Sequence, residues 1–196
     1  MRRISGFGLF LLFLFVIIFG VQGACNPWAH STFGPTLIGI WMGEFTPASR
    51  GRHVVLLDLR DAISEDSDRD LAGTATICDA RGEQRTFGVT GMTQNWRGTR
   101  FRFTTFIKAN VNGEGVQLGE VDGDWDRGDT LRVSVKPRLW RIRNGGVFSS
   151  TDRSPEQMVL EDTIVPLTLT RATDRQFRAA CEQLRTDGSG RDRSPR

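Results

Sequence analysis

The sequence predicts a mainly β protein: a single antiparallel up-and-down β-barrel of about eight strands, with a C-terminal α-helix and an N-terminal signal or anchor helix. Three observations carry this prediction. Short runs of alternating apolar and polar residues succeed one another, Gly, Asp and Asn clusters separate them, and no long helical period occurs before residue 172. The short connections favour hairpins between neighbouring strands. Closing eight such strands into a barrel leaves no exposed edge.

The alternation is clearest late in the chain, where Leu131, Val133 and Val135 alternate with polar residues. Because successive side chains of a strand point to opposite faces, one face of the sheet is apolar and the other is solvated. After an irregular linker at residues 25–36, we therefore expect a barrel domain at residues 37–171. Its strands are predicted at residues 37–45, 53–60, 71–79, 84–90, 99–108, 116–125, 130–136 and 164–171.

Two longer connections interrupt this meander. The first, residues 61–70, is acidic but lacks the ligand spacing of a cation site, so we interpret it as a solvated loop. For the second, residues 137–162, a solvated strand extension is the first interpretation. A lid over the barrel mouth and a patch for anionic lipid headgroups are the alternatives. This connection holds a basic and aromatic cluster, Arg138, Trp140, Arg141 and Arg143.

After the last strand the pattern becomes helical. Thr173 followed by Gln176 is typical of a capping box, which marks a helix start. We expect a helix at residues 172–185 that packs on the barrel, and a disordered tail at residues 186–196, which has nothing to bury. The apolar side chains with the spacing of one helix face are Phe177, Ala180, Cys181 and Leu184.

Residues 1–24 have the layout of a signal peptide or a membrane anchor. Arg2 and Arg3 precede an apolar run at residues 4–21, which as a helix would be about 27 Å long and is borderline for crossing a bilayer. The charges before this run place the N-terminus in the cytoplasm and the rest of the chain outside. We therefore expect an extracytoplasmic protein, periplasmic or at the cell surface, that is membrane-tethered or secreted.

Cys25 follows Gly23 and Ala24, at the position where a bacterial lipoprotein carries its acylated cysteine. Lipidation of Cys25, simple cleavage after Gly23 and a retained anchor are the three alternatives. In an oxidising compartment the other two cysteines, Cys78 and Cys181, are left as a pair. A disulfide is their expected state, and two separate buried thiols are the alternative.

The two ends of the predicted barrel resemble those of lipocalins, or more broadly of calycin-type barrels. Gly39-Ile40-Trp41 resembles the Gly-x-Trp of the lipocalin first strand, and the last strand ends at Arg171, where that family has an arginine packed across the tryptophan. Avidin-like barrels begin and end with similar strands. The resemblance covers roughly residues 37–185. It indicates a lipocalin-like barrel of a bacterial exported or membrane-tethered protein.

The resemblance implies that Trp41 and Arg171 form a barrel-closing pair. It also implies a disulfide between the tail and a barrel strand, a role that suits Cys78 and Cys181. Its functional implication is the binding of a small apolar molecule or lipid inside the barrel. The strand alternation places the candidate ligand-binding residues in that interior, namely Phe101, Phe103, Val121, Leu131, Val133, Leu167 and Leu169.

The alternative function is a non-enzymatic structural or accessory subunit that docks a membrane protein complex. No nucleophile elbow, phosphate loop or dinucleotide fingerprint occurs, and neither His30 nor His53 lies in a metal-ligand cluster. We therefore expect no enzymatic activity, no cofactor and no metal. The formal net charge of +3 falls to +1 without Arg2 and Arg3, so we expect no nucleic acid partner either.

Overall fold

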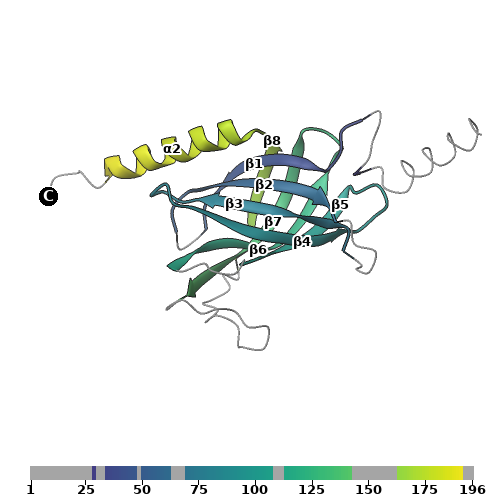
Figure 1. Cartoon of the computed structure of the whole chain (residues 1–196), viewed down its shortest axis with the longest axis horizontal. Helices are drawn as coiled ribbons and strands as arrows, with labels where there is room; N and C mark the ends of the chain where they lie inside the picture. The colour runs from purple at the N-terminus through teal and green to yellow at the C-terminus, as the bar shows by residue number, and fades with distance from the viewer. Residues whose placement is uncertain are drawn as a thin grey trace, which may run out of the picture.

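A computed structural model describes residues 28–29, 34–47, 50–62, 69–107, 113–142 and 163–191. In the described part of the chain eight antiparallel strands follow one another around a closed barrel, and a helix lies against its outside (Figure 1). The predicted fold class is confirmed, whereas the signal or anchor segment, Cys25 and His30 lie outside the described residues. The elements are β1 (Gly39–Phe45), β2 (His53–Asp61), β3 (Leu71–Cys78), β4 (Gln84–Thr93), β5 (Arg100–Phe106), β6 (Gly113–Trp125), β7 (Thr130–Ile142), β8 (Val165–Arg171) and α2 (Asp174–Arg191).

Each strand pairs with its neighbours in the sequence, and the barrel closes where β1 pairs with β8. At this seam Trp41 is the register partner of Arg171, and Met42 is the partner of Thr170. The predicted meander is therefore correct, since none of the eight described strands crosses over another.

The β6–β7 hairpin is longer than predicted. β7 continues six residues past Lys136, so residues 137–142 are a strand extension, the first of the interpretations given above. The extension is not a solvated one, which corrects that part of the prediction, because Trp140 is only 4% exposed. The remainder of the connection, residues 143–162, lies outside the described residues, as do residues 63–68 of the acidic connection.

A bulge in β6 lies where the barrel wall changes. On one side of the bulge β5 fills the wall between β4 and β6, and on the other side β5 has ended and the wall is interrupted. The β6–β7 register shifts between Gln117 and Glu120, and Gly119 there has a φ of 68°, which glycine adopts without steric cost. The Gly119 amide donates to the Thr105 hydroxyl at 2.9 Å. β5 pairs with β6 only from Glu120 onward and with β4 only from Gly88 onward. The first residues of β4 and β6 therefore extend beyond β5.

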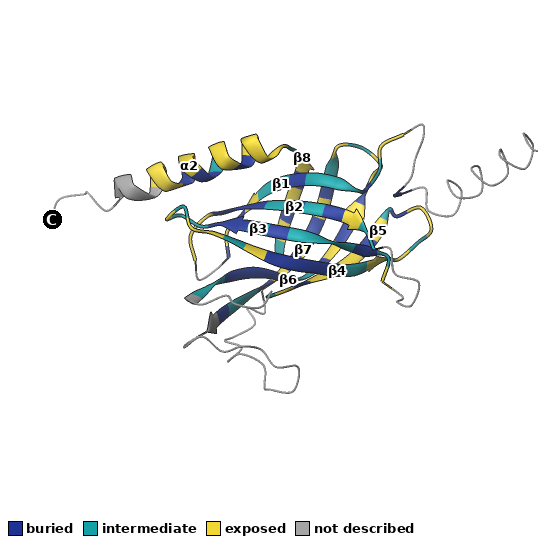
Figure 2. Ribbon diagram, in the orientation of Figure 1, coloured by how far each residue is buried: buried dark blue, intermediate teal, exposed yellow. Residues whose placement is uncertain are grey.

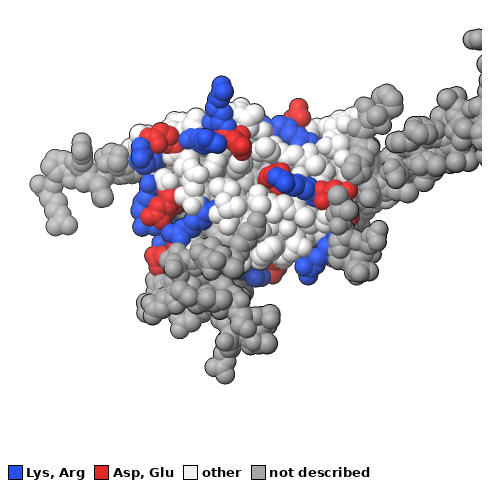
Figure 3. Space-filling model, in the orientation of Figure 1, with Lys and Arg blue, Asp and Glu red and all other residues white. Residues whose placement is uncertain are grey.

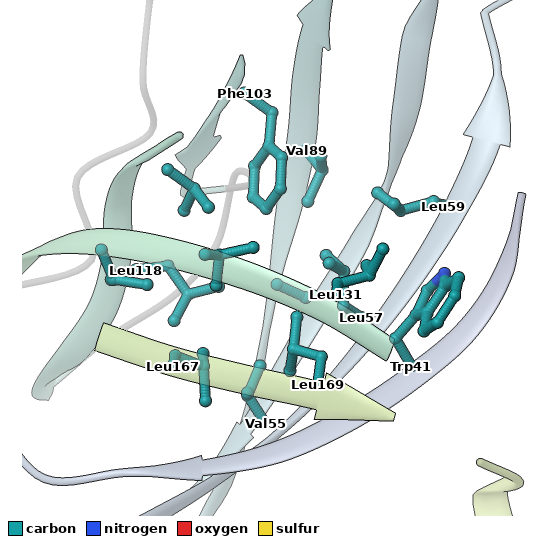
Figure 4. Packing of buried hydrophobic residues seen from close by; sticks show 14 of the residues in the cluster. Trp41, Val55, Leu57, Leu59, Val89, Phe103, Leu118, Leu131, Leu167 and Leu169 are labelled. Atoms are coloured by element: carbon teal, nitrogen blue, oxygen red, sulfur yellow. The ribbon is translucent and has the colours of Figure 1, made fainter. Parts of the chain in front are cut away.

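Alternating apolar side chains fill the barrel interior. Dark buried and light exposed residues alternate along the strands in Figure 2, and the labelled side chains of Figure 4 point toward one another from opposite walls. Two glycines make room for large rings, since a Cβ at Gly123 would lie 2.1 Å from the Phe101 ring and one at Gly91 would lie 2.5 Å from the Phe103 Cβ. Large and small residues thus interdigitate, as dense core packing requires.

One end of the barrel is closed by the residues before β1. This plugged end carries the β4–β5 and β6–β7 connections. Trp28 is buried there, its carbonyl accepts from the Leu37 amide at 2.8 Å, and its side chain packs on Gly98. The Trp41 indole N–H donates to the Leu37 carbonyl at 2.9 Å. Leu37 is thereby held between two tryptophans at the base of the core.

Helix α2 covers part of the outer face of β2 and β3. A capping box begins the helix, as predicted, because the Thr173 amide and hydroxyl both donate to the Gln176 side chain at 2.9 Å. The predicted disulfide is confirmed: Cys78 of β3 is bonded to Cys181 of α2, with 5.8 Å between their Cα atoms. The disulfide lies in a second apolar cluster, made of Val54, Cys78, Phe177, Cys181 and Leu184.

The helix ends later than the sequence predicts. It extends to Arg191, so residues 186–191 are helical and the expectation of disorder from residue 186 is wrong for them. Each further helical residue adds one hydrogen bond to an established helix, and no proline interrupts this stretch. In addition, Arg52 and Asp187 form an ion pair at 3.3 Å that ties the last turns to the barrel.

Candidate functional site

The seven interior residues predicted to bind a ligand are all buried in one apolar cluster. They come from β5, β6, β7 and β8, and the Phe101 and Phe103 rings are stacked with centroids 6.1 Å apart. The residues are thus brought together as predicted, but they pack against other core side chains such as Trp41, Leu57 and Leu118 (Figure 4). A cavity of the described residues lies instead at the end of the barrel opposite the plug.

Trp41 and Arg171, the predicted barrel-closing pair, are in contact. The Arg171 guanidinium lies over the Trp41 ring at 3.7 Å from its centroid and donates to the Ile38 carbonyl at 2.8 Å. It also donates to the Thr36 carbonyl. Partial burial lowers the pKa of Arg171, and the charge of Asp129 raises it. The pair therefore links the first and last strands of the barrel to the residues before β1. Its role is to stabilise the β1–β8 seam, and it lines no pocket of the described residues.

The end opposite the plug, which we call the open end, carries the β1–β2 and β3–β4 connections. A partly open cavity of about 180 Å³ lies there. Ile77 and Val116 supply apolar lining, and the remaining lining is mostly polar. Its complete lining is Arg50, Gly51, His53, Ile77, Asp79, Ala80, Arg81, Glu83, Arg85, Gly115 and Val116.

The polar side of this cavity is a set of partly exposed ion pairs. Arg85 pairs with Glu83 at 2.8 Å, and Arg81 pairs with Asp79 at 3.3 Å. Arg50 pairs with Glu114 across the opening at 3.7 Å. Basic and acidic side chains are accordingly intermixed at this end of the molecule, on the left in Figure 3. Exposed pairs of this kind stabilise the fold by about 1 kcal/mol or less each, so their partners can be exchanged at little cost.

Trp140 fills the interruption of the wall beyond β5. It is the register partner of Gly115, and a Cβ at Gly115 would lie 3.2 Å from the indole ring. The ring therefore reaches across Gly115 to β4, where it meets the Phe87 ring edge-on at 6.2 Å and lies 5.0 Å from the Arg85 guanidinium. Because glycine has no side chain, the indole is buried instead of solvated.

Three buried polar atoms of β6 and β7 have no hydrogen-bond partner among the described residues: the indole Nε1 of Trp140, the amide Oε1 of Gln117 and the guanidinium Nε of Arg138. Trp140 and Gln117 are more than nine-tenths buried. An unpaired buried polar atom costs about 1–3 kcal/mol relative to a paired one. The open end thus retains unused hydrogen-bonding capacity where β6 passes the cavity.

His53 is a titratable side chain that lines the open-end cavity. It is buried, its Nδ1 is 2.6 Å from the Gly51 carbonyl, and its ring lies 5.5 Å from that of Phe45. Burial lowers the pKa of His53 from 6.5, while the Gly51 hydrogen bond and the charge of Asp79 raise it. The neutral imidazole, which donates from Nδ1 to Gly51 and keeps Nε2 as an acceptor, is therefore favoured.

A second, shallower groove of about 440 Å³ crosses the outer faces of β5 to β8. Two cross-strand ion pairs lie in it, Arg102 with Asp122 at 2.5 Å and Arg100 with Asp124 at 3.7 Å. The strand period predicts Asp122 and Asp124 on the outer face, where the structure places them. The groove also has apolar residues in its lining, namely Phe101, Val133, Pro166 and Leu167, but it lies on the outer face of the barrel and is more open than the cavity at the open end.

Sequence reasoning missed the residues of the open-end cavity. Ile77 and Arg85 are register partners on the inward face of β3 and β4, which the strand period alone could have indicated. Their meeting with Gly115 and Val116 of β6 depends on where β5 ends. The cluster around Trp140 is the one signal in the sequence that points toward this end.

No protein-family model matches the chain, and comparison with curated proteins and with solved structures finds no match either. In the described part of the chain no helix is long and apolar enough to span a membrane. The described residues likewise contain no group of three or more His, Cys, Asp or Glu side chains placed to hold a metal ion. The structure thus defines the protein as a closed, eight-stranded up-and-down barrel with a disulfide-linked C-terminal helix.

Proposed function

We propose that this protein is an exported, membrane-associated, lipocalin-like barrel that binds a small lipid or other apolar ligand with a polar head at its open end. The observation that carries the proposal is the open-end cavity, in which Ile77 and Val116 lie beside Arg85. Sites for small molecules combine an apolar lining with a few convergent polar groups in this way. The signal or anchor segment and the Gly39-Ile40-Trp41 motif with Arg171 support the compartment and the family resemblance.

The charge of the cavity favours a ligand with an anionic head. Arg85 is held over Trp140, and its partner Glu83 has a side chain that is 48% exposed. A ligand carboxylate or phosphate can take the place of Glu83, because Glu83 regains full hydration when it is displaced. The Trp140 indole N–H, which lacks a partner among the described residues, belongs to the ring that the Arg85 guanidinium covers.

The size of the cavity limits what it holds. Its volume of about 180 Å³ is below the roughly 300–1,000 Å³ of common ligand sites. The head and first carbons of a lipid fit that volume, and a longer chain needs a rearrangement around Trp140. We therefore expect short-chain acids to bind with a higher affinity per carbon atom than long-chain acids.

Titration with a fluorescent fatty acid tests this function. The whole chain should show saturable, one-to-one binding, and Arg85→Ala should weaken it about 10- to 100-fold, because a hydrogen bond to a charged group contributes about 1.5–3 kcal/mol. The matching fatty alcohol should bind both proteins equally. Arg100→Ala, which removes an exposed arginine on the outer face, is the matched control. Absence of saturable uptake by the unaltered protein would overturn the proposal.

A second candidate function is a non-enzymatic accessory subunit that docks a membrane protein. It is favoured by one observation, the close packing of all seven interior candidates in the apolar core. Extraction in mild detergent followed by native mass measurement distinguishes the two functions. A larger complex supports the subunit, whereas a monomer that carries a lipid supports the ligand-binding protein.

A further inference from the structure

Trp96 differs from the other tryptophans of the protein in its exposure. Its side chain is 63% exposed, whereas the other four, Trp28, Trp41, Trp125 and Trp140, are all buried. An exposed tryptophan loses the burial of a large apolar ring, and its indole is suited to a surface that is apolar on one side and wet on the other. Trp96 therefore needs an explanation that the core does not supply.

The turn that carries Trp96 is well ordered by hydrogen bonds. It joins β4 to β5 at the plugged end, and the Asn95 side chain bonds to the Thr99 hydroxyl and amide at 2.9 and 3.0 Å. The Gly98 amide donates to the Asn95 carbonyl at 2.9 Å. Arg97 lies over the Trp96 ring at 5.1 Å from its centroid. The turn thus presents an aromatic ring and a cation together at its tip.

The same turn lies where the N-terminal segment reaches the barrel. A Cβ at Gly98 would lie 2.2 Å from the Trp28 Cβ, so the turn and Trp28 are in direct contact. Seven chain steps separate Trp28 from Val21, the last residue of the apolar run, which is about 25 Å at full extension. Cys25 is three steps away, or about 11 Å. A membrane anchor or a lipid on Cys25, the tethers of the proposed function, would therefore attach the plugged end to the membrane.

We propose that the plugged end faces a lipid bilayer and that Trp96 lies in its headgroup layer, with Arg97 beside the lipid phosphates. This orientation rests on the proposed membrane association. Tryptophan is enriched at the membrane–water interface, where its ring and its N–H both find suitable surroundings. Arginine beside it can extend its guanidinium toward phosphate. The open end then points away from the bilayer and takes its ligand from the aqueous side.

The charges at the plugged end favour a bilayer contact made by Trp96 over one made by a basic patch. The β6–β7 connection at the same end carries Asp126, Arg127 and Asp129, so its side chains have a net negative charge. Carboxylates there oppose a general attraction to anionic lipid. We therefore expect vesicles of phosphatidylcholine alone to bring Trp96 into the interface as well as vesicles that also contain phosphatidylglycerol.

Fluorescence quenching tests this orientation on the full chain reconstituted in phosphatidylcholine vesicles. Since the other four tryptophans are buried, the difference in emission between the unaltered protein and Trp96→Phe reports on Trp96 alone. Brominated phosphatidylcholine should quench that emission strongly, and iodide in the water should quench it several-fold less than in the detergent-solubilised protein. Trp96 that remains fully accessible to iodide on the vesicles would overturn the inference.

Two reporter variants supply the matched controls. In the Trp96→Phe background, Ile164→Trp places an indole before β8 at the open end, where the native side chain is 54% exposed, and Phe106→Trp places one on the outer wall, where it is 46% exposed. Both should stay accessible to iodide and unquenched by bromolipid. Protection of the Ile164→Trp reporter instead would reverse the orientation. Failure of the protein to float with the vesicles would overturn the membrane association itself, while flotation with an accessible Trp96 overturns the orientation only.

Discussion

The two ends of the barrel satisfy their buried groups in different ways. At the plugged end the indole N–H groups of Trp41 and Trp125 donate to the Leu37 and Gly128 carbonyls, each at 2.9 Å. At the open end Trp140 is buried too, yet its indole N–H has no partner in the described part of the chain, and the cavity beside it is lined by ion pairs. The buried indole N–H groups of the plugged end are therefore hydrogen-bonded within the protein, while the open end has a buried donor that can still accept a partner.

This difference separates stability from binding. A fully packed and hydrogen-bonded end contributes most of the stabilising contacts, and substitutions there should unfold the protein. An end with an interrupted wall and unpaired polar atoms is less stable locally and is suited to a ligand. Substitutions in the lining of the open-end cavity should change binding more than unfolding. Four predictions test this difference between the two ends.

The largest effect is expected for Trp41→Ala at the plugged end. The substitution removes a fully buried ring that Arg171 covers, and it leaves the Leu37 carbonyl without its donor. Truncating a buried tryptophan costs about 3–5 kcal/mol. Denaturant unfolding measures the loss. Trp96→Ala is the control, because an exposed side chain should change the free energy of unfolding by no more than about 0.5 kcal/mol.

The next largest effect is expected for the disulfide, which ties α2 to the open end. Its cysteines are 103 residues apart in the sequence. Removing a native cross-link costs about 2–4 kcal/mol in the free energy of unfolding, since the unfolded chain becomes less restricted. The double variant Cys78→Ala/Cys181→Ala should show this loss. Reductant should lower the stability of the unaltered protein to that level and leave the double variant unchanged.

A matched pair of glycine substitutions on β6 compares the two ends directly. A Cβ at Gly123, toward the plugged end, would lie 2.1 Å from the buried Phe101 ring, whereas one at Gly115, at the open end, would lie 3.2 Å from the Trp140 ring. Overpacking a filled core costs about 1–3 kcal/mol, so Gly123→Ala should destabilise by that amount. Gly115→Ala should cost less than half as much. Equal losses in thermal or denaturant unfolding would contradict the proposed difference in packing.

The smallest effect is expected for the titration of His53. Burial lowers the pKa of His53 in the folded protein from 6.5, so the unfolded chain binds more protons. Its contribution to stability is complete above pH 6.5 and decreases as the pH falls from there through the lower folded pKa. As the pH is lowered below 6.5, the free energy of unfolding should therefore fall less steeply for His53→Gln than for the unaltered protein. The same slope in both would assign the pH dependence to other groups.

The strand pattern could be predicted because it depends on near neighbours along the chain. A period of two places Leu131, Val133 and Val135 on one face wherever the strand lies, and the short connections leave few topologies other than a meander. The strand ends were less predictable. β7 continues through Pro137 because residues before the β6 bulge pair with it, and no local signal in the sequence shows where β5 stops.

The open-end site could be predicted only in part. The cluster around Trp140 was identified, but its solvated interpretation was wrong, because Gly115 on the neighbouring strand lets the ring cross to Phe87. Likewise, the strand pattern predicts Ile77 and Val116 only as core residues, and the structure shows that they line the cavity. Contacts between three hairpins are long-range, and the residue types alone do not specify them.

The sequence by itself therefore determined the fold class, the order of the strands, the start of the helix and the cysteine pair, because each follows from local periodicity, capping or composition. The tertiary structure decided which end of the barrel is plugged, which end is open and which polar side chains meet there. The physical reason is that packing depends on shape across distant strands. The missing side chain of Gly115 and the end of β5 at Phe106 create the site beside Trp140.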